Sequence, residues 1–181
     1  MIVPEGKILV TTCDNEVHVI PNTTDVSGLD GCNHEEADSR LILHAVHALQ
    51  NGMENIIIKA TDTDVVVLAV YTSSKYRNMK LWVEFGLGQN KRFINVRGIA
   101  DSLGSAKCSG LLFMHAVSGC DVVSQPYGIG KKTAWEIYRA MPSIITTFAD
   151  LTNAPARVTD EHMAEIERYK LQENITLIIC Q

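Results

Sequence analysis

The segment Asn55–Ala60, with the sequence NIIIKA, constrains the fold of this chain more than any other stretch. Three consecutive isoleucines favour a buried β-strand, because β-branched side chains pack well on a pleated surface. Immediately upstream, His34–Gln50 has apolar residues at helical spacing and is closed by Asn51-Gly52, which predicts a helix. A helix that leads into a buried strand is typical of an α/β fold.

The rest of the chain alternates at first and then becomes helical. Two short strands are expected within Lys7–Ile20, around a turn at Asp14-Asn15, and the run Val65–Tyr71 fits either a strand or a helix. Further strands are expected at Leu81–Phe85 and Arg92–Val96, and helices at Ile99–Leu103, Leu111–Val117, Lys131–Met141, Ser143–Leu151 and Asp160–Gln172. We therefore predict an α/β fold with a helical C-terminal part.

The composition is that of an ordinary globular protein. Of 181 residues, 46% are apolar and 20% are charged, and the net charge of -5 argues against a protein that coats nucleic acid through bulk charge. The five cysteines include no C-x-x-C pair, which favours reduced thiols in an intracellular protein. The N-terminus lacks the pattern of a secretory signal, and no apolar run is long enough to cross a membrane.

Two carboxylates follow the central strand. Asp62 and Asp64 lie in the turn Thr61–Asp64, directly after Ala60. If the chain remains extended there, the strand period of two directs both side chains the same way. Two like charges that close repel each other, and a bound Mg²⁺ or Mn²⁺ would offset the repulsion. The alternative is a plain turn, because Asp and Thr both favour turns and caps.

Acidic residues also open the preceding helix, in the sequence His34-Glu35-Glu36-Ala37-Asp38. Acids in a first turn are favoured by the helix dipole, and Asn33 with Glu36 fits a capping box. The functional alternative is that Glu36, with Asp38 as a second candidate, points into the same site as the two carboxylates of the turn.

A further acidic residue, Asp121, precedes a glycine turn and a helix. Gly128-Ile129-Gly130 leads into Lys131 and Lys132 at the start of the predicted helix. Such a turn leaves backbone N–H groups free for a phosphate, and a helix N-terminus favours negative charge. The spacing is not that of a Walker A loop. The alternative is a tight turn followed by two solvated lysines.

In this order, the three motifs resemble the second half of the flap endonuclease and excision-repair 5′-nuclease family, part of the PIN-like group. Members of that family have a Glu-x-Glu-Ala helix start, an Asp-x-Asp after a strand, and a Gly-x-Asp followed by a Gly-Ile-Gly helix–turn–helix. The corresponding segments of this chain are His34–Ala37, Ala60–Asp64 and Ser118–Ala134.

The resemblance implies a largely parallel sheet flanked by helices, with a PIN-like nuclease core over residues 1–122 and a helical DNA-backbone-binding region over residues 123–181. It implies two divalent ions, Mg²⁺ or Mn²⁺, bound by the catalytic residues Glu36, Asp62, Asp64 and Asp121, with Asp38 as a further metal ligand. It also implies contacts to the DNA backbone from Gly128, Gly130, Lys131 and Lys132. We therefore expect a structure-selective nuclease acting on branched or single-stranded DNA, with RNA as a possible substrate, in the nucleus rather than the cytoplasm.

Two departures bear on that function. His34 stands where the family has its first Glu, which leaves His34, Glu35 or Asp38 to complete the ligands. The family's earlier strands, each ending in an Asp, are not found, and Asp14 is better explained as a hairpin residue. The alternative function is a degenerate or truncated nuclease-like domain that binds nucleic acid or a protein partner without catalysis. Within the predicted helices, we interpret three histidines as packed or half-exposed side chains rather than ligands: His44, His47 and His115.

Overall fold

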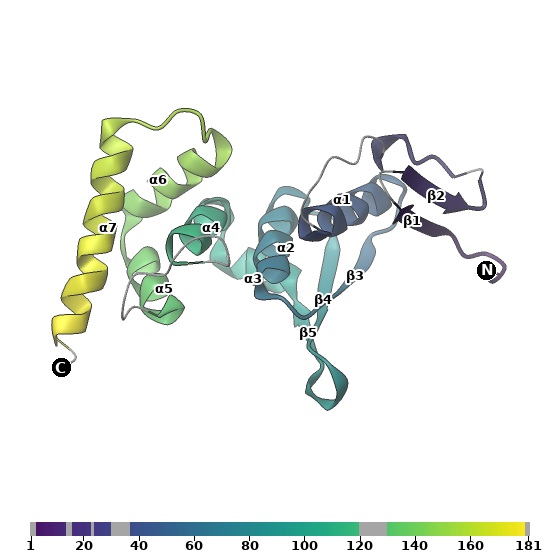
Figure 1. Ribbon diagram of the computed structural model, residues 1–181, viewed down its shortest axis with the longest axis horizontal. Coiled ribbons are helices and arrows are strands. Elements are labelled where there is room, and N and C mark those ends of the chain that lie inside the picture. The colour runs from purple at the N-terminus through teal and green to yellow at the C-terminus, as the bar shows by residue number, and fades with distance from the viewer. Residues whose placement is uncertain (1–2, 14–15, 23, 30–36, 120–129, 180–181) are drawn as a thin grey trace.

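The computed structural model of this protein describes residues 3–13, 16–22, 24–29, 37–119 and 130–179. Its strands are β1 (Leu9–Cys13), β2 (Glu16–Ile20), β3 (Asn55–Ala60), β4 (Lys80–Phe85) and β5 (Arg92–Asn95). Its α-helices are α1 (Ala37–Gln50), α2 (Thr63–Lys75), α3 (Val96–Leu103), α4 (Ser105–Val117), α5 (Lys131–Ala140), α6 (Pro142–Asn153) and α7 (Asp160–Ile179), and short 3₁₀ helices are η1 (Ser27–Leu29) and η2 (Gly88–Asn90). The described strands lie in the first part of the chain and helices fill the second, which confirms the α/β class with a helical C-terminal part (Figure 1).

The described strands form two separate sheets. β1 and β2 pair as an antiparallel hairpin, as the sequence predicts. The other sheet has the order β3-β4-β5, in which β3 and β4 are parallel and β4 and β5 are antiparallel. The expectation of a largely parallel sheet is therefore wrong for the described strands, because residues 86–91 between β4 and β5 are too few for a crossover. Gly86 adopts a φ of 98° in this turn, where a Cβ would lie 2.9 Å from the Asn90 carbonyl oxygen.

The ambiguous run Val65–Tyr71 is helical and belongs to α2. Parallel strands require a crossover connection, and α2 provides it between β3 and β4. The β-branched valines of this run have only modest helix propensity. Their burial against the sheet and α4 outweighs it, since Val65 and Val70 are both part of the core.

Polar contacts attach the N-terminal hairpin to α1. The Arg40 guanidinium donates from Nη2 to Thr12 Oγ1 at 3.1 Å, and His44 Nε2 lies 3.3 Å from the same oxygen. One helical turn further on, His47 Nε2 lies 3.0 Å from the carbonyl oxygen of Asp25. His44 and His47 are therefore packed side chains, as the sequence predicts.

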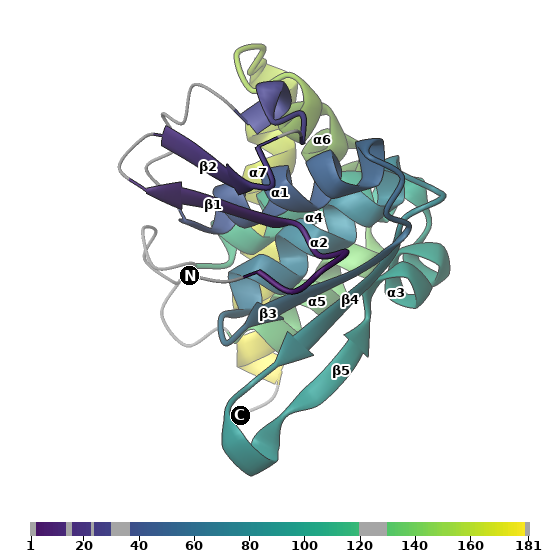
Figure 2. The same cartoon turned by 90° about the vertical axis from the view of Figure 1, so that its right-hand side faces the viewer.

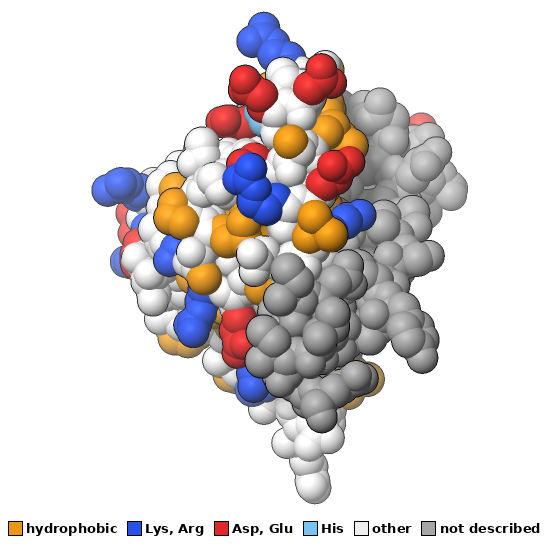
Figure 3. All heavy atoms as spheres, turned by 90° about the vertical axis from the view of Figure 1, so that its left-hand side faces the viewer, with side chains coloured by type: hydrophobic (Ala, Val, Ile, Leu, Met, Phe, Trp, Pro, Cys, Tyr) orange, Lys and Arg blue, Asp and Glu red, His pale blue; other side chains and the backbone are white. Residues whose placement is uncertain are grey.

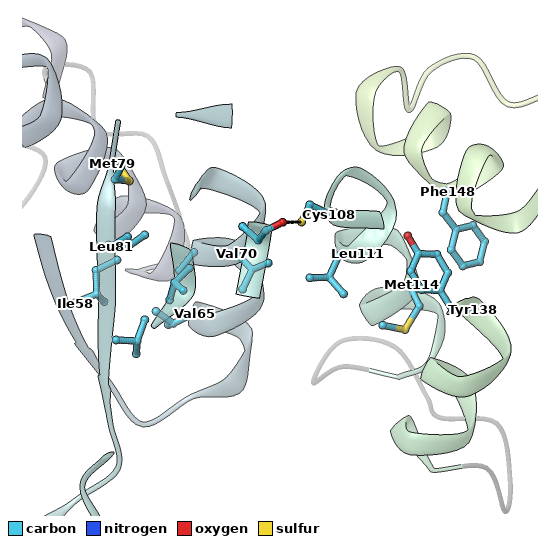
Figure 4. Packing of buried hydrophobic residues seen from close by; sticks show 14 of the residues in the cluster. Ile58, Val65, Val70, Met79, Leu81, Cys108, Leu111, Met114, Tyr138 and Phe148 are labelled. Atoms are coloured by element: carbon cyan, nitrogen blue, oxygen red, sulfur yellow. Dashed lines mark hydrogen bonds between the residues drawn. The ribbon is translucent and has the colours of Figure 1, made fainter. Parts of the chain in front are cut away.

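A single apolar core runs from the sheet to the last helix. Figure 4 shows Ile58 and Leu81 on the sheet side of α2, and Leu111 and Tyr138 on its far side. Gly110 allows α4 and α6 to approach closely, since a Cβ there would lie 3.1 Å from the backbone nitrogen of Ala149. The predicted boundary between residues 122 and 123 lies outside the described residues, and this division into two regions stays a prediction.

The helices of the C-terminal part begin within one residue of where the sequence predicts, but α7 extends to Ile179 and is therefore longer than the predicted Asp160–Gln172. Pro142 lies in the first turn of α6, where its missing N–H does no harm. Thr159 caps α7, because its Oγ1 accepts from the His162 backbone N–H at 3.2 Å. Tyr169 of α7 donates its hydroxyl proton to the Ala134 carbonyl oxygen at 2.8 Å and so joins α7 to α5. Among the described helices, none combines the length and the apolar character that a membrane span needs.

Candidate functional site

The candidate site lies at the edge of the sheet where β3 ends and α2 begins. Asp62 is the N-cap of α2, and its Oδ1 accepts a hydrogen bond from the Asp64 backbone N–H at 2.9 Å. The capped helix starts at Thr63, so the chain does not remain extended through the turn. The expectation that Asp62 and Asp64 are aligned by a strand period is therefore wrong. The two carboxylates instead lie at the N-terminus of a helix, which favours negative charge.

Asp64 contacts a residue that is distant in the sequence. Its Oδ1 accepts a hydrogen bond from His115 Nε2 at 2.8 Å, and both side chains are partly buried. His115 lies in the last turn of α4, so this contact joins the start of α2 to the end of α4. The interpretation of His115 as a packed histidine missed this role. The signal in the sequence is its position, six residues before Asp121 and three residues before the segment that carries the Gly-x-Asp motif.

Lys131 completes the polar group that the structure describes. Its Nζ lies 3.4 Å from both ring nitrogens of His115. Lys131 and Lys132 are exposed in the first turn of α5, and Gly130 is the N-cap without a side-chain cap. A carboxylate, an imidazole and an ammonium group therefore meet where the start of α2, the end of α4 and the start of α5 come together.

Several predicted site residues lie outside the described residues: His34, Glu35, Glu36, Asp121 and Gly128. The start of α1, which carries Asp38, is described. Only residues 51–54 connect α1 to β3, and the two elements are packed together, so they run in opposite directions. Their lengths match at about 20 Å. The N-terminal end of α1 is therefore expected at the same edge of the sheet as Asp62.

The described residues do not by themselves form a metal site. No group of three or more acidic, histidine or cysteine side chains that could hold a metal ion occurs among them. The carboxylates of Asp62 and Asp64 are hard oxygen donors of the kind that Mg²⁺ and Mn²⁺ prefer. Each accepts a described hydrogen bond through only one of its two oxygens. The donor chemistry therefore fits a divalent cation, and further ligands would have to come from other residues.

The surface of the helical part carries both signs of charge. Figure 3 shows that, on its described portion, acidic and basic side chains are interspersed with small apolar areas. A broad basic surface is not seen on the described part of this face. Any contact with a nucleic acid there would have to use a few local groups rather than bulk charge.

Comparisons of this chain with protein-family models, with curated proteins and with solved structures give no match.

Proposed function

We propose that this chain is a divalent-metal-dependent, structure-selective nuclease domain of PIN-like fold that hydrolyses phosphodiester bonds in DNA. The observation that carries the proposal is the hydrogen bond between Asp64 and His115. It joins the end of β3 to the end of α4, and these two ends lead into the Asp-x-Asp and Gly-x-Asp motifs. The contact thus supports a single site to which both acidic motifs contribute.

The residues that would hold the metal ions are carboxylates from several elements. Asp62 and Asp64 would bind two ions together with the predicted ligands Glu36, Asp38 and Asp121. When bound, the ions activate a water molecule and stabilise the leaving oxygen in phosphodiester hydrolysis.

The other residues of the site would orient the ligands and the substrate. His115 donates to Asp64 and so fixes the orientation of that carboxylate. Lys131 and Lys132, with the backbone of Gly128 and Gly130, would contact a DNA phosphate without reading the base. Branched or single-stranded DNA ends are the proposed substrate, RNA is a second one, and a DNA substrate favours a nuclear location.

A second function is favoured by two specific observations. The family's earlier strands that end in an Asp are not found in the sequence, and the net charge of the chain is -5. Both are compatible with a nuclease-like domain that binds a nucleic acid or a protein partner without catalysis. The two functions are distinguished by metal binding and by cleavage.

The decisive experiment compares charge-removing variants in a cleavage assay with Mn²⁺ and branched or single-stranded DNA. Asn caps helices as well as Asp does, so Asp62→Asn removes the charge and keeps the cap of α2. We expect Asp62→Asn and Asp64→Asn to reduce cleavage by about 100-fold or more, since a metal ion supplies several kcal/mol of charge stabilisation. Asp150→Asn, on the exposed surface of α6, is the matched control. A parent chain that neither cuts nor binds Mn²⁺ in calorimetry would rule out the nuclease.

The proposed phosphate contact has its own test. Replacing Lys131 and Lys132 by Ala should weaken DNA binding and reduce the slope of log affinity against log salt by about two, one unit for each lost contact. Lys170→Ala, an exposed lysine of α7, should leave the slope unchanged. An unchanged slope in the double variant would exclude this turn as a phosphate clamp.

A further inference from the structure

One face of the three-stranded sheet is open. Ile57 of β3 pairs with Trp82 of β4, and Phe93 of β5 follows on the third strand, opposite Glu84. Their exposed fractions are 59%, 39% and 61%, although each lies within a strand. We call these three side chains the apolar stripe. Figure 2 views this side of the molecule, with β4 and β5 in front and the helices behind them.

The opposite face shows what is unusual about the apolar stripe. Ile58, Leu81 and Val83 are at most 4% exposed, because α1, α2 and α3 pack against that face. Sheets that contain parallel strands normally have both faces covered. Here none of the described helices covers the second face, so three large apolar side chains remain in water beside one another. Contiguous exposed apolar surface of this kind marks interaction sites.

Lysines surround the apolar stripe. Lys59 and Lys91 lie 3.6 Å and 2.7 Å from the carboxylate of Glu84, which lies between them. The side chain of Glu84 is only 13% exposed, whereas that of Lys59 is 76% exposed. A partner would therefore meet the ammonium groups before the carboxylate. At the other end of the stripe, Lys80 forms an ion pair with Glu54 at 3.3 Å.

This charge pattern distinguishes three kinds of occupant. A second copy of the chain would bring against this surface a rim of the same charge, with three lysines to two glutamates, and the two rims would repel each other. A nucleic acid needs several unmatched cations, and each of the three lysines here already lies beside a glutamate: Lys59 and Lys91 share Glu84, and Lys80 pairs with Glu54. A protein segment with apolar residues along its centre and a few acidic residues at its sides fits both the stripe and its rim. An α-helix is also about 10–12 Å wide, which matches the distance of about 10 Å across three strands.

We propose that the open face of the β3-β4-β5 sheet is a docking surface for an acidic amphipathic helix of a protein partner, with the apolar stripe as its contact and the surrounding lysines as its charge filter. This binding surface is distinct from the acidic site at the end of β3 and does not depend on nuclease activity. The apolar face of the partner helix covers Ile57, Trp82 and Phe93, and its acidic flanks contact Lys59 and Lys91.

The test uses two synthetic helical peptides of about 18 residues, or five turns, with the same leucine face. One peptide has glutamates at the sides of that face and the other has lysines. Binding to the full chain is measured by calorimetry. We expect the acidic peptide to bind at least about tenfold more tightly than the basic one. The double variant Ile57→Ser/Phe93→Ser should lose at least about tenfold in affinity for it.

Two controls separate this surface from general apolar binding. Leu171→Ser removes a side chain that is 60% exposed on α7, and it should leave the peptide affinity unchanged. Lys59→Gln/Lys91→Gln should remove the preference for the acidic peptide and leave the unfolding midpoint close to that of the parent. A circular-dichroism melt verifies that each variant is folded.

Other outcomes would overturn the proposal. Equal affinity for both peptides would show that the lysines do not select an acidic partner. No binding of either peptide would show that this face is not a docking surface for a helix. A dimer in light scattering that Ile57→Ser/Phe93→Ser converts to a monomer would assign the face to a second copy. Binding of a thymidine oligonucleotide that the same variant abolishes would assign it to nucleic acid.

Discussion

The interior between α4 and α6 and the polar edge at the end of β3 differ in what fixes their geometry. In the interior, close packing fixes how α4 and α6 lie against each other. A Cβ on Gly110 would lie 2.6 Å from Tyr138 Oη and 3.0 Å from Phe148 Cβ. At the edge, two hydrogen bonds fix the positions of the side chains: the cap from Asp62 and the contact between Asp64 and His115. Substitutions in the interior should therefore change stability, whereas those at the edge should change charge and chemistry with little effect on stability.

The largest effect is expected where the interior reaches the sheet. Ile58→Ala should reduce the free energy of unfolding by about 3 kcal/mol, because it removes buried methyl groups and leaves a cavity. Ile57→Ala is the matched control on the adjacent residue, and its cost should stay below about 1 kcal/mol because the side chain is exposed. Urea denaturation measures both. Equal costs would mean that the two faces of the sheet do not differ in burial.

Gly110→Ala tests the close approach of α4 and α6. Alanine favours a helix by about 1 kcal/mol over glycine, but here the added methyl group meets Phe148 Cβ and the Ala149 backbone. We expect a net loss of about 2 kcal/mol from overpacking, measured by urea denaturation. Gly28→Ala, whose nearest contact would be 3.6 Å away at His47, should cost little. A stabilised Gly110→Ala would show that the helices can separate freely.

At the polar edge, Asp64→Ala tests the sign of a small effect. Repulsion between Asp62 and Asp64 alone predicts that removal of Asp64 stabilises the metal-free fold. The contact with His115 and the position in the first turn of α2 oppose this. We therefore expect a loss of about 0.5 kcal/mol in a thermal melt with chelator. A higher melting temperature than that of Asp150→Ala would show that repulsion dominates.

The smallest effect concerns His44 of α1, which is half-buried and lies outside both the α4–α6 interior and the polar edge at the end of β3. Burial, followed by the charges of Arg40 and His47, lowers the pKa of His44 below its usual 6.5. The unfolded chain therefore takes up a proton as the pH falls below about 6.5, while the folded chain resists it. The contribution of His44 is present above that pH and is lost on acidification. His44→Gln should flatten the fall of melting temperature between about pH 6.5 and 5, and an unchanged slope would assign the fall to other groups.

The sequence predicts the elements with strong local patterns. The strand Asn55–Ala60 and the helix after Gly130 are confirmed. The first is a short β-branched run that directly follows a closed helix, and the second has a one-sided apolar face at helical spacing. The valine-rich run after Asp64 could not be assigned, because β-branched residues fit a buried helix and a buried strand alike. Its state depends on the Asp62 cap and on packing against α4, which lies far along the chain.

In the site, too, the features set by neighbouring residues were predictable and those set by distant residues were not. The positions of Asp62 and Asp64 after β3 follow from the local pattern, but their alignment does not, because α2 begins between them. The pairing of Asp64 with His115 spans 51 residues and depends on how α2 and α4 pack. No periodicity within either helix contains that information, so a histidine with an ordinary helical environment in the sequence becomes part of the site in three dimensions.

The continuity of the apolar core has a consequence for cooperativity. Trp135 lies on α5 at one end of the core, with its ring 5.7 Å from that of Tyr138. Trp82 lies on β4, the strand whose Leu81 and Val83 form the other end of the same core. α2 and α4 pack against each other and connect the sheet to α5. Unfolding of either end of the core would therefore expose the apolar side chains that it covers at the other end. The intrinsic fluorescence of single-tryptophan variants should then report one coincident unfolding transition, as for a two-state protein, rather than two transitions separated near residue 122.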